Sequence, residues 1–350
     1  MTISSPLWAR HVHADRRPRL IARGRITAAI RAFFVARDFI EVETGALQVS
    51  PGNETHLHAF ATALTLPDTG PQPFYLHTSP EFACKKLLSA GEDRIFTLAR
   101  AYRNGERSAL HHPEFTMLEW YRTDADYSRL MFEAVEIIQL AARKAECDAF
   151  QWRGASCDPF AQFHRLSVAE AFLEFADIDL LATLQPEPDV AMLAQMAARL
   201  GIRLAPDDAW SDIFSRILSE KIEPHLGRGR ITVLDEYPAC EAALARKCEN
   251  DPRVSERFEI YACGVELANA FGELTDADEQ RHRFEHEMTE KQRIYGETYP
   301  LDEDFLSALR EMPPACGIAL GLDRLVMLCT GATKIEDVLW NPMPQPVLLP

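Results

Sequence analysis

The sequence predicts an α+β fold, in which an antiparallel sheet is flanked by helices. Residues 94–103 (RIFTLARAYR) and 115–122 (FTMLEWYR) alternate with period two and are joined by a charged loop, as two paired strands are. Residues 256–274 predict a second hairpin, which turns at Cys263-Gly264. Around these strands, apolar residues recur at helical spacing. This mixture of alternating strands and amphipathic helices is typical of the α+β class.

Before the first hairpin, we expect a helix, a strand and a shorter helix. Residues 24–38 carry apolar side chains at helical spacing, and the strand FIEVET (39–44) follows them. A polar loop precedes Ser79-Pro80-Glu81. Serine and proline before a glutamate are typical of a helix start, so we expect a short helix there.

The middle of the chain predicts a helical insertion. Residues 128–147 have the pattern of an amphipathic helix, and residues 165–223 contain further helices separated by polar loops. We expect residues 142–250 to pack as an insertion on a single catalytic domain that spans residues 1–350. Residues 231–238 (ITVLDEYP) are expected to return to the sheet.

Two further elements close the chain. Residues 276–295 predict a long polar helix. Residues 315–331 predict a strand of small residues that runs into an apolar helix, with Asp323-Arg324 at the junction. No internal repeat and no low-complexity tract interrupts this order.

The composition is that of a soluble globular protein, with 47% hydrophobic and 26% charged residues among 350. No apolar run approaches the roughly 18 residues of a membrane span, and the first residues lack the apolar core of a secretory signal. Eight scattered cysteines without a C-x-x-C pair predict reduced thiols and a cytoplasmic protein. The net charge of −16 favours a small cation or a basic protein surface as partner, although a local basic patch could still bind nucleic acid.

One face of the strand at 115–122 is a poor core and a plausible floor of a site. Alternation places Phe115, Met117, Glu119 and Tyr121 on this face, and Arg103 ends the facing strand. A carboxylate, a phenol, an aromatic ring and a guanidinium can together hold a cation, an anion and a flat base.

The segment 96–122 resembles motif 2 of the class II aminoacyl-tRNA synthetases, closest to the lysyl enzymes, whose pattern is roughly FRNE…HNPEFTM-x-E-x-Y. Residues 24–44 resemble motif 1, which implies a homodimer, although Gly45 stands where the family has proline. Residues 315–331 resemble motif 3. The resemblance covers residues 20–140 and 230–345 well. It implies a six- to seven-stranded antiparallel sheet flanked by helices.

The resemblance implies that ATP activates the carboxylate of an amino acid. Both reactants are anions, so the site must supply positive charge and hold them in line. Arg103 and Arg324 match the family's catalytic arginines. The other positions that match its ATP-binding residues are Asn104, Gly105, His112, Phe115, Glu266, Leu267 and Gly321. Glu259 and Glu266 match its magnesium ligands, and carboxylate oxygens suit Mg²⁺.

The resemblance also implies a pocket for a substrate with two amines and one carboxylate. Glu119, Tyr121 and Glu273 match the group that binds the side-chain ammonium, Glu81 matches the residue that binds the backbone amine, and Asn269 matches the carboxylate contact. The full set of matching positions is Ser79, Pro80, Glu81, Glu119, Tyr121, Ala268, Asn269 and Glu273. Lysine or a lysine isomer is the implied substrate.

The residues around Ala268 (LANAF) resemble a paralogous family, the elongation factor P (R)-β-lysine ligases, which read LANGF where lysyl-tRNA synthetases read GNGF. We expect the Ala268 methyl group at the pocket wall, where it could separate β-lysine from α-lysine. Ala270 departs from both families. Lysyl-tRNA synthetases also carry an N-terminal OB-fold that binds the anticodon, and we expect none in the roughly 20 residues before motif 1.

The leading expectation is therefore an ATP-dependent ligase that forms an adenylate of (R)-β-lysine or lysine and transfers the aminoacyl group to a lysine of elongation factor P. Two alternatives stay open. A truncated lysyl-type enzyme could charge tRNA or another acceptor, and residues 221–230 are a modest basic candidate for that contact. An inactive paralogue could act as a regulatory subunit, which the departures at Gly45, Gly105 and His112 would suit. No residue stands out as the base that deprotonates the acceptor amine.

Overall fold

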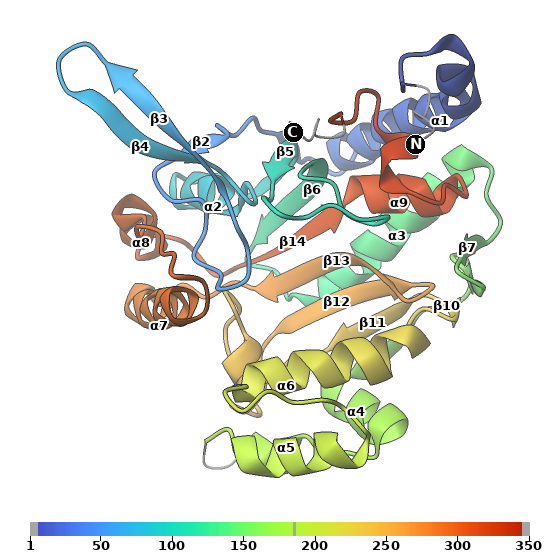
Figure 1. Ribbon diagram of the computed structural model, residues 1–350. Helices are drawn as coiled ribbons and strands as arrows, with labels where there is room; N and C mark the ends of the chain where they lie inside the picture. The colour runs from blue at the N-terminus through green and yellow to red at the C-terminus, as the bar shows by residue number, and fades with distance from the viewer. Residues whose placement is uncertain (1–5, 185–186, 345–350) are drawn as a thin grey trace, which may run out of the picture.

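The computed structural model describes residues 6–184 and 187–344. Its centre is an eight-stranded sheet in the order β1-β5-β6-β14-β13-β12-β11-β9 (Figure 1). In that order, the strands are β1 (Ile40–Glu41), β5 (Arg94–Tyr102), β6 (Glu114–Thr123), β14 (Ala315–Gly321), β13 (Val265–Gly272), β12 (Arg257–Ala262), β11 (Thr232–Asp235) and β9 (His164–Ser167).

The six inner strands pair antiparallel, whereas the edge strands β1 and β9 pair parallel with β5 and β11. The α+β class is confirmed. The sheet has one strand more than the larger number we expected. Edge strand β1 lies within the strand expected over 39–44, whereas the four residues of β9 are too few for a visible pattern. Both predicted hairpins form, and the second turns at Cys263-Gly264.

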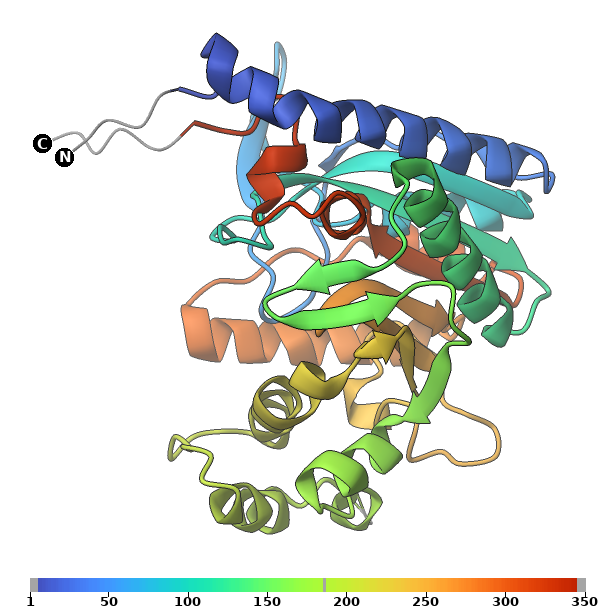
Figure 2. The same cartoon turned by 90° about the vertical axis from the view of Figure 1, so that its right-hand side faces the viewer.

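Helices cover both faces of the sheet (Figures 1 and 2). On one face, α1 (Arg10–Val35), α3 (Ser128–Ala145) and α9 (Leu322–Cys329) pack over the buried side chains of Leu118 and Trp120. On the other face lie α2 (Glu81–Ser89), α7 (Ala277–Tyr295) and α8 (Glu303–Leu309). The side chains of Glu119 and Tyr121 on β6 point toward this second face.

Helix α1 begins at Arg10, fourteen residues before the expected start at Gly24. The added turns carry almost no apolar periodicity, because arginines anchor them. Buried Arg16 donates to the carbonyl of Glu336 at 2.9 Å, and buried Arg23 pairs with Asp323. The strand expected over 39–44 is confined to the two residues of β1.

We expected the segment 142–250 to be a helical insertion, but it also contains strands. It contributes β9 and β11 to the central sheet, and it also forms a small, separate three-stranded sheet. Those three strands are β7 (Phe150–Trp152), β8 (Ala155–Asp158) and β10 (Gly229–Arg230). Its helices pack on one another through stacked Phe172 and Phe214. They are α4 (Val168–Ala176), α5 (Val190–Arg199), α6 (Trp210–Ile217) and the π-helical turn η2 (Leu218–Ile222).

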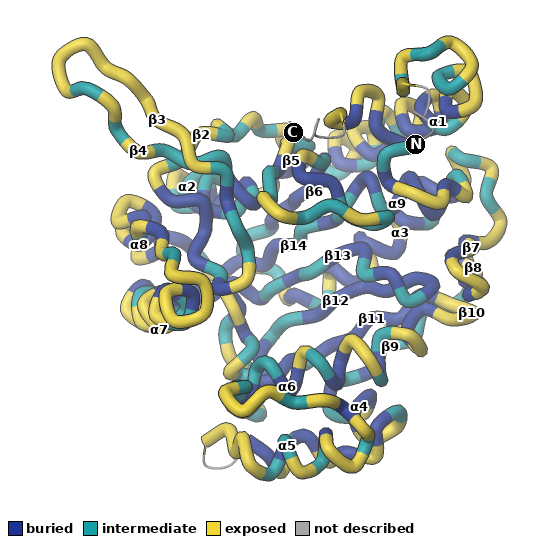
Figure 3. Tube along the Cα trace, in the orientation of Figure 1, coloured by how far each residue is buried: buried dark blue, intermediate teal, exposed yellow. Residues whose placement is uncertain are grey.

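A hairpin of β3 (Phe60–Leu66) and β4 (Gly70–Leu76) projects from the body, with β2 (Leu47–Gln48) paired to its base (Figure 1). Most of its residues are exposed or half-buried (Figure 3). The remaining short helices are η1 (Leu181–Leu184), η3 (Glu223–His225), η4 (Ala239–Glu241) and η5 (Ile335–Val338).

All eight cysteines lie in the described part of the chain, and every one is a free thiol. Among the described helices, none combines the length and the apolar character that crossing a membrane requires.

Candidate active site

Strand register brings the expected substrate residues together on the face of the sheet toward α2 and α7. Ala319 of β14 pairs with Glu119 of β6 on one side and with Asn269 of β13 on the other. One row further, Gly317 pairs with Tyr121 and Phe271. Because paired residues in a sheet point to the same face, these side chains line one surface.

Glu119 lies at the floor of this surface and is fully buried. The Ser79 hydroxyl donates to its Oε1 at 2.5 Å, and the Tyr121 hydroxyl donates to its Oε2 at 2.7 Å. Ser79 also accepts the backbone N–H of Glu81 at 3.1 Å, next to Pro80 at the start of α2. The hairpin and α2 therefore hold the carboxylate in one orientation.

A lysine that no motif or periodic pattern singles out, Lys85, lies among the carboxylates expected to bind amines. Lys85 Nζ is 2.6 Å from Glu81 Oε1 and 2.5 Å from Glu273 Oε2. Lys85 and Glu273 are each about 1% exposed. The structure thus brings together Glu81, Glu119, Tyr121 and Glu273 as expected, and adds a resident ammonium group.

The pocket is short of positive charge. Burial, and then the charge of Glu81, raises the pKa of Glu119 to about 8. Burial also raises the pKa of Glu273 to about 7, although Lys85 opposes the shift. A carboxyl group with a raised pKa gains a proton when its charge has no partner. Cationic groups of a ligand would remove this cost.

We therefore expect amino-acid binding to release protons. Glu119 is largely protonated at pH 7 because its pKa is about 8, and a bound ammonium would favour the ionised form. Calorimetry of lysine or β-lysine binding in buffers of different ionisation enthalpy should show release at pH 7 that vanishes well above pH 8. The Glu119→Gln variant should lose most of the release. Equal release in that variant would contradict the assignment.

Gly317 leaves the space that this arrangement needs. A Cβ at this position would overlap the ring of Tyr121 and the Oε1 atom of Glu273. Neither neighbour is free to move, since both are buried. Glycine is therefore required at this position because the neighbouring side chains leave no space for a Cβ, and not because the backbone turns here.

The expectation for Ala268 is wrong in its geometry. Ala268 pairs with Leu320, and both side chains lie in the core on the opposite face of the sheet, with Ala268 only 2% exposed. The alanine whose methyl group is on the substrate face is Ala319, between Glu119 and Asn269. Asn269 itself has a buried Oδ1 atom without a hydrogen-bond partner, which fits a residue that contacts a ligand.

The expected catalytic arginine Arg103 follows β5 directly. Its guanidinium lies 5.3 Å from the Phe115 ring centroid and 3.9 Å from Glu106, and its Nε makes a long 3.4 Å bond to the Thr78 carbonyl. Most of its donors therefore stay available to anions.

Arg324 lies on the other side, at the start of α9. It donates to the carbonyl of Glu266 at 2.9 Å and is 2.7 Å from Nε2 of His111. Gly321 borders the carbonyl of Leu267 and the side chain of Arg324, and a Cβ here would make only ordinary van der Waals contacts with them.

His112, the residue expected to contact ATP, is 3% exposed, and both of its ring nitrogens have backbone partners. Nδ1 is 2.5 Å from the Glu114 carbonyl, and Nε2 accepts the Met343 N–H at 3.1 Å. Its neighbour His111 reaches the site instead. Asn104 and Gly105 are exposed in the loop between β5 and β6, where Gly105 has a φ of 82°.

Glu259 and Glu266 border one cavity of about 500 Å³, together with Glu223. Glu259 accepts from Tyr237 at 2.7 Å and from Arg257 at 2.7 Å, so its carboxylate is already oriented. Burial, followed by the charges of Glu259 and Glu266, raises the pKa of Glu223 to about 7. These hard oxygen atoms fit Mg²⁺, which commonly takes one or two carboxylates beside phosphate oxygens. Within residues 6–184 and 187–344, no three metal-binding side chains are already arranged around one point.

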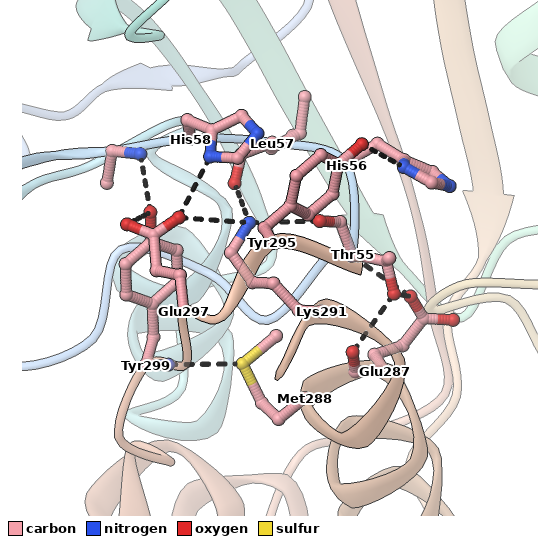
Figure 4. Close-up of polar contacts among 11 residues, drawn as sticks. Thr55, His56, Leu57, His58, Glu287, Met288, Lys291, Tyr295, Glu297 and Tyr299 are labelled. Atoms are coloured by element: carbon pink, nitrogen blue, oxygen red, sulfur yellow. Dashed lines mark hydrogen bonds and ion pairs between the residues drawn. The ribbon is translucent and has the colours of Figure 1, made fainter. Parts of the chain in front are cut away.

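The loop that contains Thr55 and Leu57 is hydrogen-bonded to α7 (Figure 4). Lys291 donates to the carbonyls of Thr55 and Leu57 at 2.9 and 2.7 Å, and Glu287 accepts the Thr55 N–H at 3.0 Å. The preceding residue, Glu54, borders a small pocket with Ser79 and Glu81. Its Oε2 atom is buried without a partner, and burial raises its pKa to about 7. No periodic pattern or motif in the sequence singles out Glu54.

Residues 7–345 match the family profile of the class II tRNA synthetases (D, K and N). The chain belongs to this family, as its sheet, its motif arginines and its carboxylate pocket had indicated.

Its relatives include proteins named elongation factor P–(R)-β-lysine ligase. The one from Pectobacterium carotovorum subsp. carotovorum (strain PC1) is 39% identical over 324 residues, which cover 91% of this chain and 93% of the relative. The one from Yersinia enterocolitica serotype O:8 is 39% identical over 328 residues, or 93% and 94% of the two chains. The one from Photorhabdus laumondii is 38% identical over 324 residues, or 91% and 93%. Both resemblances stated from the sequence are thereby confirmed.

Proposed function

We propose that this chain is an ATP-dependent ligase that activates (R)-β-lysine, or lysine, and transfers it to the ε-amino group of a lysine on elongation factor P. The observation that carries the proposal is the buried pocket of Glu81, Glu119 and Glu273, which lacks enough positive charge. A diamino acid supplies two ammonium groups. The relatives that match over 90% of the chain bear the name of this activity.

In the first step, a carboxylate oxygen of the amino acid attacks the α-phosphorus of ATP, and the bond to pyrophosphate breaks. The Arg103 guanidinium would donate hydrogen bonds to the substrate carboxylate and to the α-phosphate at once, because its donors have few partners in the protein. Phe115 offers a flat face for adenine beside that guanidinium. Arg324 adds positive charge on the far side of the nucleotide. Glu259 and Glu266 would hold Mg²⁺, which neutralises phosphate charge when bound.

In the second step, the ε-amine of the acceptor attacks the carbonyl carbon of the adenylate. A C–N bond forms, the C–O bond to AMP breaks, and the amine loses a proton. The proposal includes a cytoplasmic reaction without tRNA and a homodimer. Val35 and Ile40, at the end of α1 and on edge strand β1, support a dimer because these apolar side chains are 63% and 55% exposed.

The test is ATP–pyrophosphate exchange with (R)-β-lysine and L-lysine side by side, followed by transfer to purified elongation factor P or to tRNA. We expect exchange with β-lysine in excess over L-lysine, and transfer to the protein alone. Transfer of L-lysine to tRNA would replace the proposal by a lysyl-tRNA synthetase activity. No exchange with either amino acid would indicate an inactive paralogue.

A further inference from the structure

Lys85 occupies a place where a substrate ammonium group could otherwise bind. It lies one helical turn after Glu81 on α2, and its ammonium group touches both Glu81 and Glu273. Its side chain is 1% exposed. A lysine is almost never buried to this degree unless its charge is paired. Within the described residues, Nζ has no hydrogen-bond partner beyond these two ion pairs.

The charges of the pocket indicate why such a lysine is useful. Glu81, Glu119 and Glu273 carry three negative charges when ionised, and Lys85 offsets one of them. Two remain, which is the number of ammonium groups in lysine and its isomers. A fourth carboxylate, Glu54, borders the pocket in the field of the Arg103 guanidinium, which opposes its charge. Without Lys85, a bound diamino acid would leave one buried carboxylate unpaired, which is costly.

Lys85 also fixes the spacing between the two ends of the pocket. Glu81 begins α2, whereas Glu273 follows β13, and the two segments are far apart in the chain. One nitrogen atom in contact with both carboxylates holds them at a set separation. Each carboxylate keeps its second oxygen for the ligand. The separation of these oxygens then selects the distance between two amines.

We propose that Lys85 is a positioning residue that sets both the number and the spacing of the ammonium groups that the pocket accepts. This inference rests on the proposed function, in which the pocket binds the amines of the substrate. Lys85 itself acts through Glu81 and Glu273.

Other ionisable groups near the cluster do not replace Lys85. Arg246 lies within the field of Glu273 but is paired with Glu256 at 2.7 Å. Cys84 lies within the field of Glu119, and Cys316 lies on the core face of β14 within the field of Glu273. Burial raises the pKa of both thiols, so they add no charge. Among the described residues around the three carboxylates, Lys85 is therefore the cation that both Glu81 and Glu273 share.

The test compares Lys85→Met with Lys86→Met. Lys86 is a matched control because it is on the same helix and also pairs with two carboxylates, Asp302 and Asp304, outside the pocket. In Lys85→Met, we expect the KM for the amino acid in pyrophosphate exchange to rise at least about tenfold. The KM for ATP should stay unchanged. Lys86→Met should leave both constants near those of the unaltered enzyme.

The pH profile separates a charge role from a packing role. Lys85 opposes the rise in the pKa of Glu273, so without its ammonium that pKa rises further and the ionised pocket forms only at higher pH. The acidic limb of kcat/KM for the amino acid should therefore move to higher pH in Lys85→Met. A change in thermal stability with an unmoved acidic limb and an unchanged KM for the amino acid would overturn the proposal.

Chemical rescue provides a second measurement if Lys85→Met folds poorly. Lys85→Ala removes the atoms that n-propylammonium can supply, so this cation should restore exchange, whereas n-propanol should not. Failure of n-propylammonium to restore exchange would count against the charge role. A different result would contradict the proposed function itself: no exchange by the unaltered enzyme with any diamino acid.

Discussion

Replacement of Arg103 by alanine is expected to lower ATP–pyrophosphate exchange by about 10²–10³-fold, the usual cost of removing one donor from a developing anion. The guanidinium has only a long bond to Thr78 and a 3.9 Å contact with Glu106, so it contributes little to folding. Its loss should therefore reduce kcat strongly while the melting temperature changes little. The Arg103→Lys variant should recover part of the rate, because lysine keeps the charge and loses the planar fork.

Arg100→Ala is the matched control for this prediction. Arg100 is on β5, three residues before Arg103, and its ion pair with Glu114 spans 3.7 Å between two half-exposed side chains. Exposed pairs of this kind contribute little, so exchange should stay within about twofold. An Arg103→Ala enzyme that keeps exchange within about tenfold would show that the anions are held by other residues.

Much of this site could be predicted from the sequence, because its residues lie on strands with clear alternation. Period two placed Glu119 and Tyr121 on one face, and the structure gives the same face. The part of α1 before Gly24 was not expected, because few apolar residues recur at helical spacing there. Buried Arg16 and Arg23 anchor those turns together with Leu20. Within 142–250, β11 lies in the expected segment 231–238, whereas the other strands were missed because they are too short for periodicity to be visible.

The errors within the site have different causes. Ala268 was placed at the pocket wall by the resemblance of LANAF to LANGF, whereas period-two alternation along β13 puts it on the face opposite to Asn269. Lys85 was missed because a lysine four residues after a glutamate is usually an exposed helical pair. Only the approach of Glu273 from a distant segment makes that lysine part of the pocket. Such contacts depend on tertiary structure, and a local pattern does not contain them.

Ala319→Gly is expected to increase the use of L-lysine relative to (R)-β-lysine. The methyl group of Ala319 is on the substrate face, directly between Glu119 and Asn269 in the register of the sheet. Those two residues are assigned to the side-chain ammonium and the carboxylate of the substrate. Moving an amino group from the β to the α carbon shifts it toward the carboxylate by about one bond length. A missing methyl group in that region leaves space for the shifted amine.

The expected change in the ratio of kcat/KM values is about tenfold or more, the usual effect of one methyl group in a binding pocket. Glycine in the strand should also cost roughly 0.5–1 kcal/mol of stability. Ala268→Gly is the matched control, since it makes the same substitution on the adjacent strand but on the core face, where Ala268 is 2% exposed. It should lower stability and leave the substrate ratio unchanged. If instead Ala268→Gly changed the ratio and Ala319→Gly did not, the register of β13 and β14 would not be what selects the substrate. The pair of variants thus tests whether the face of the sheet, rather than the local sequence LANAF, carries the discrimination.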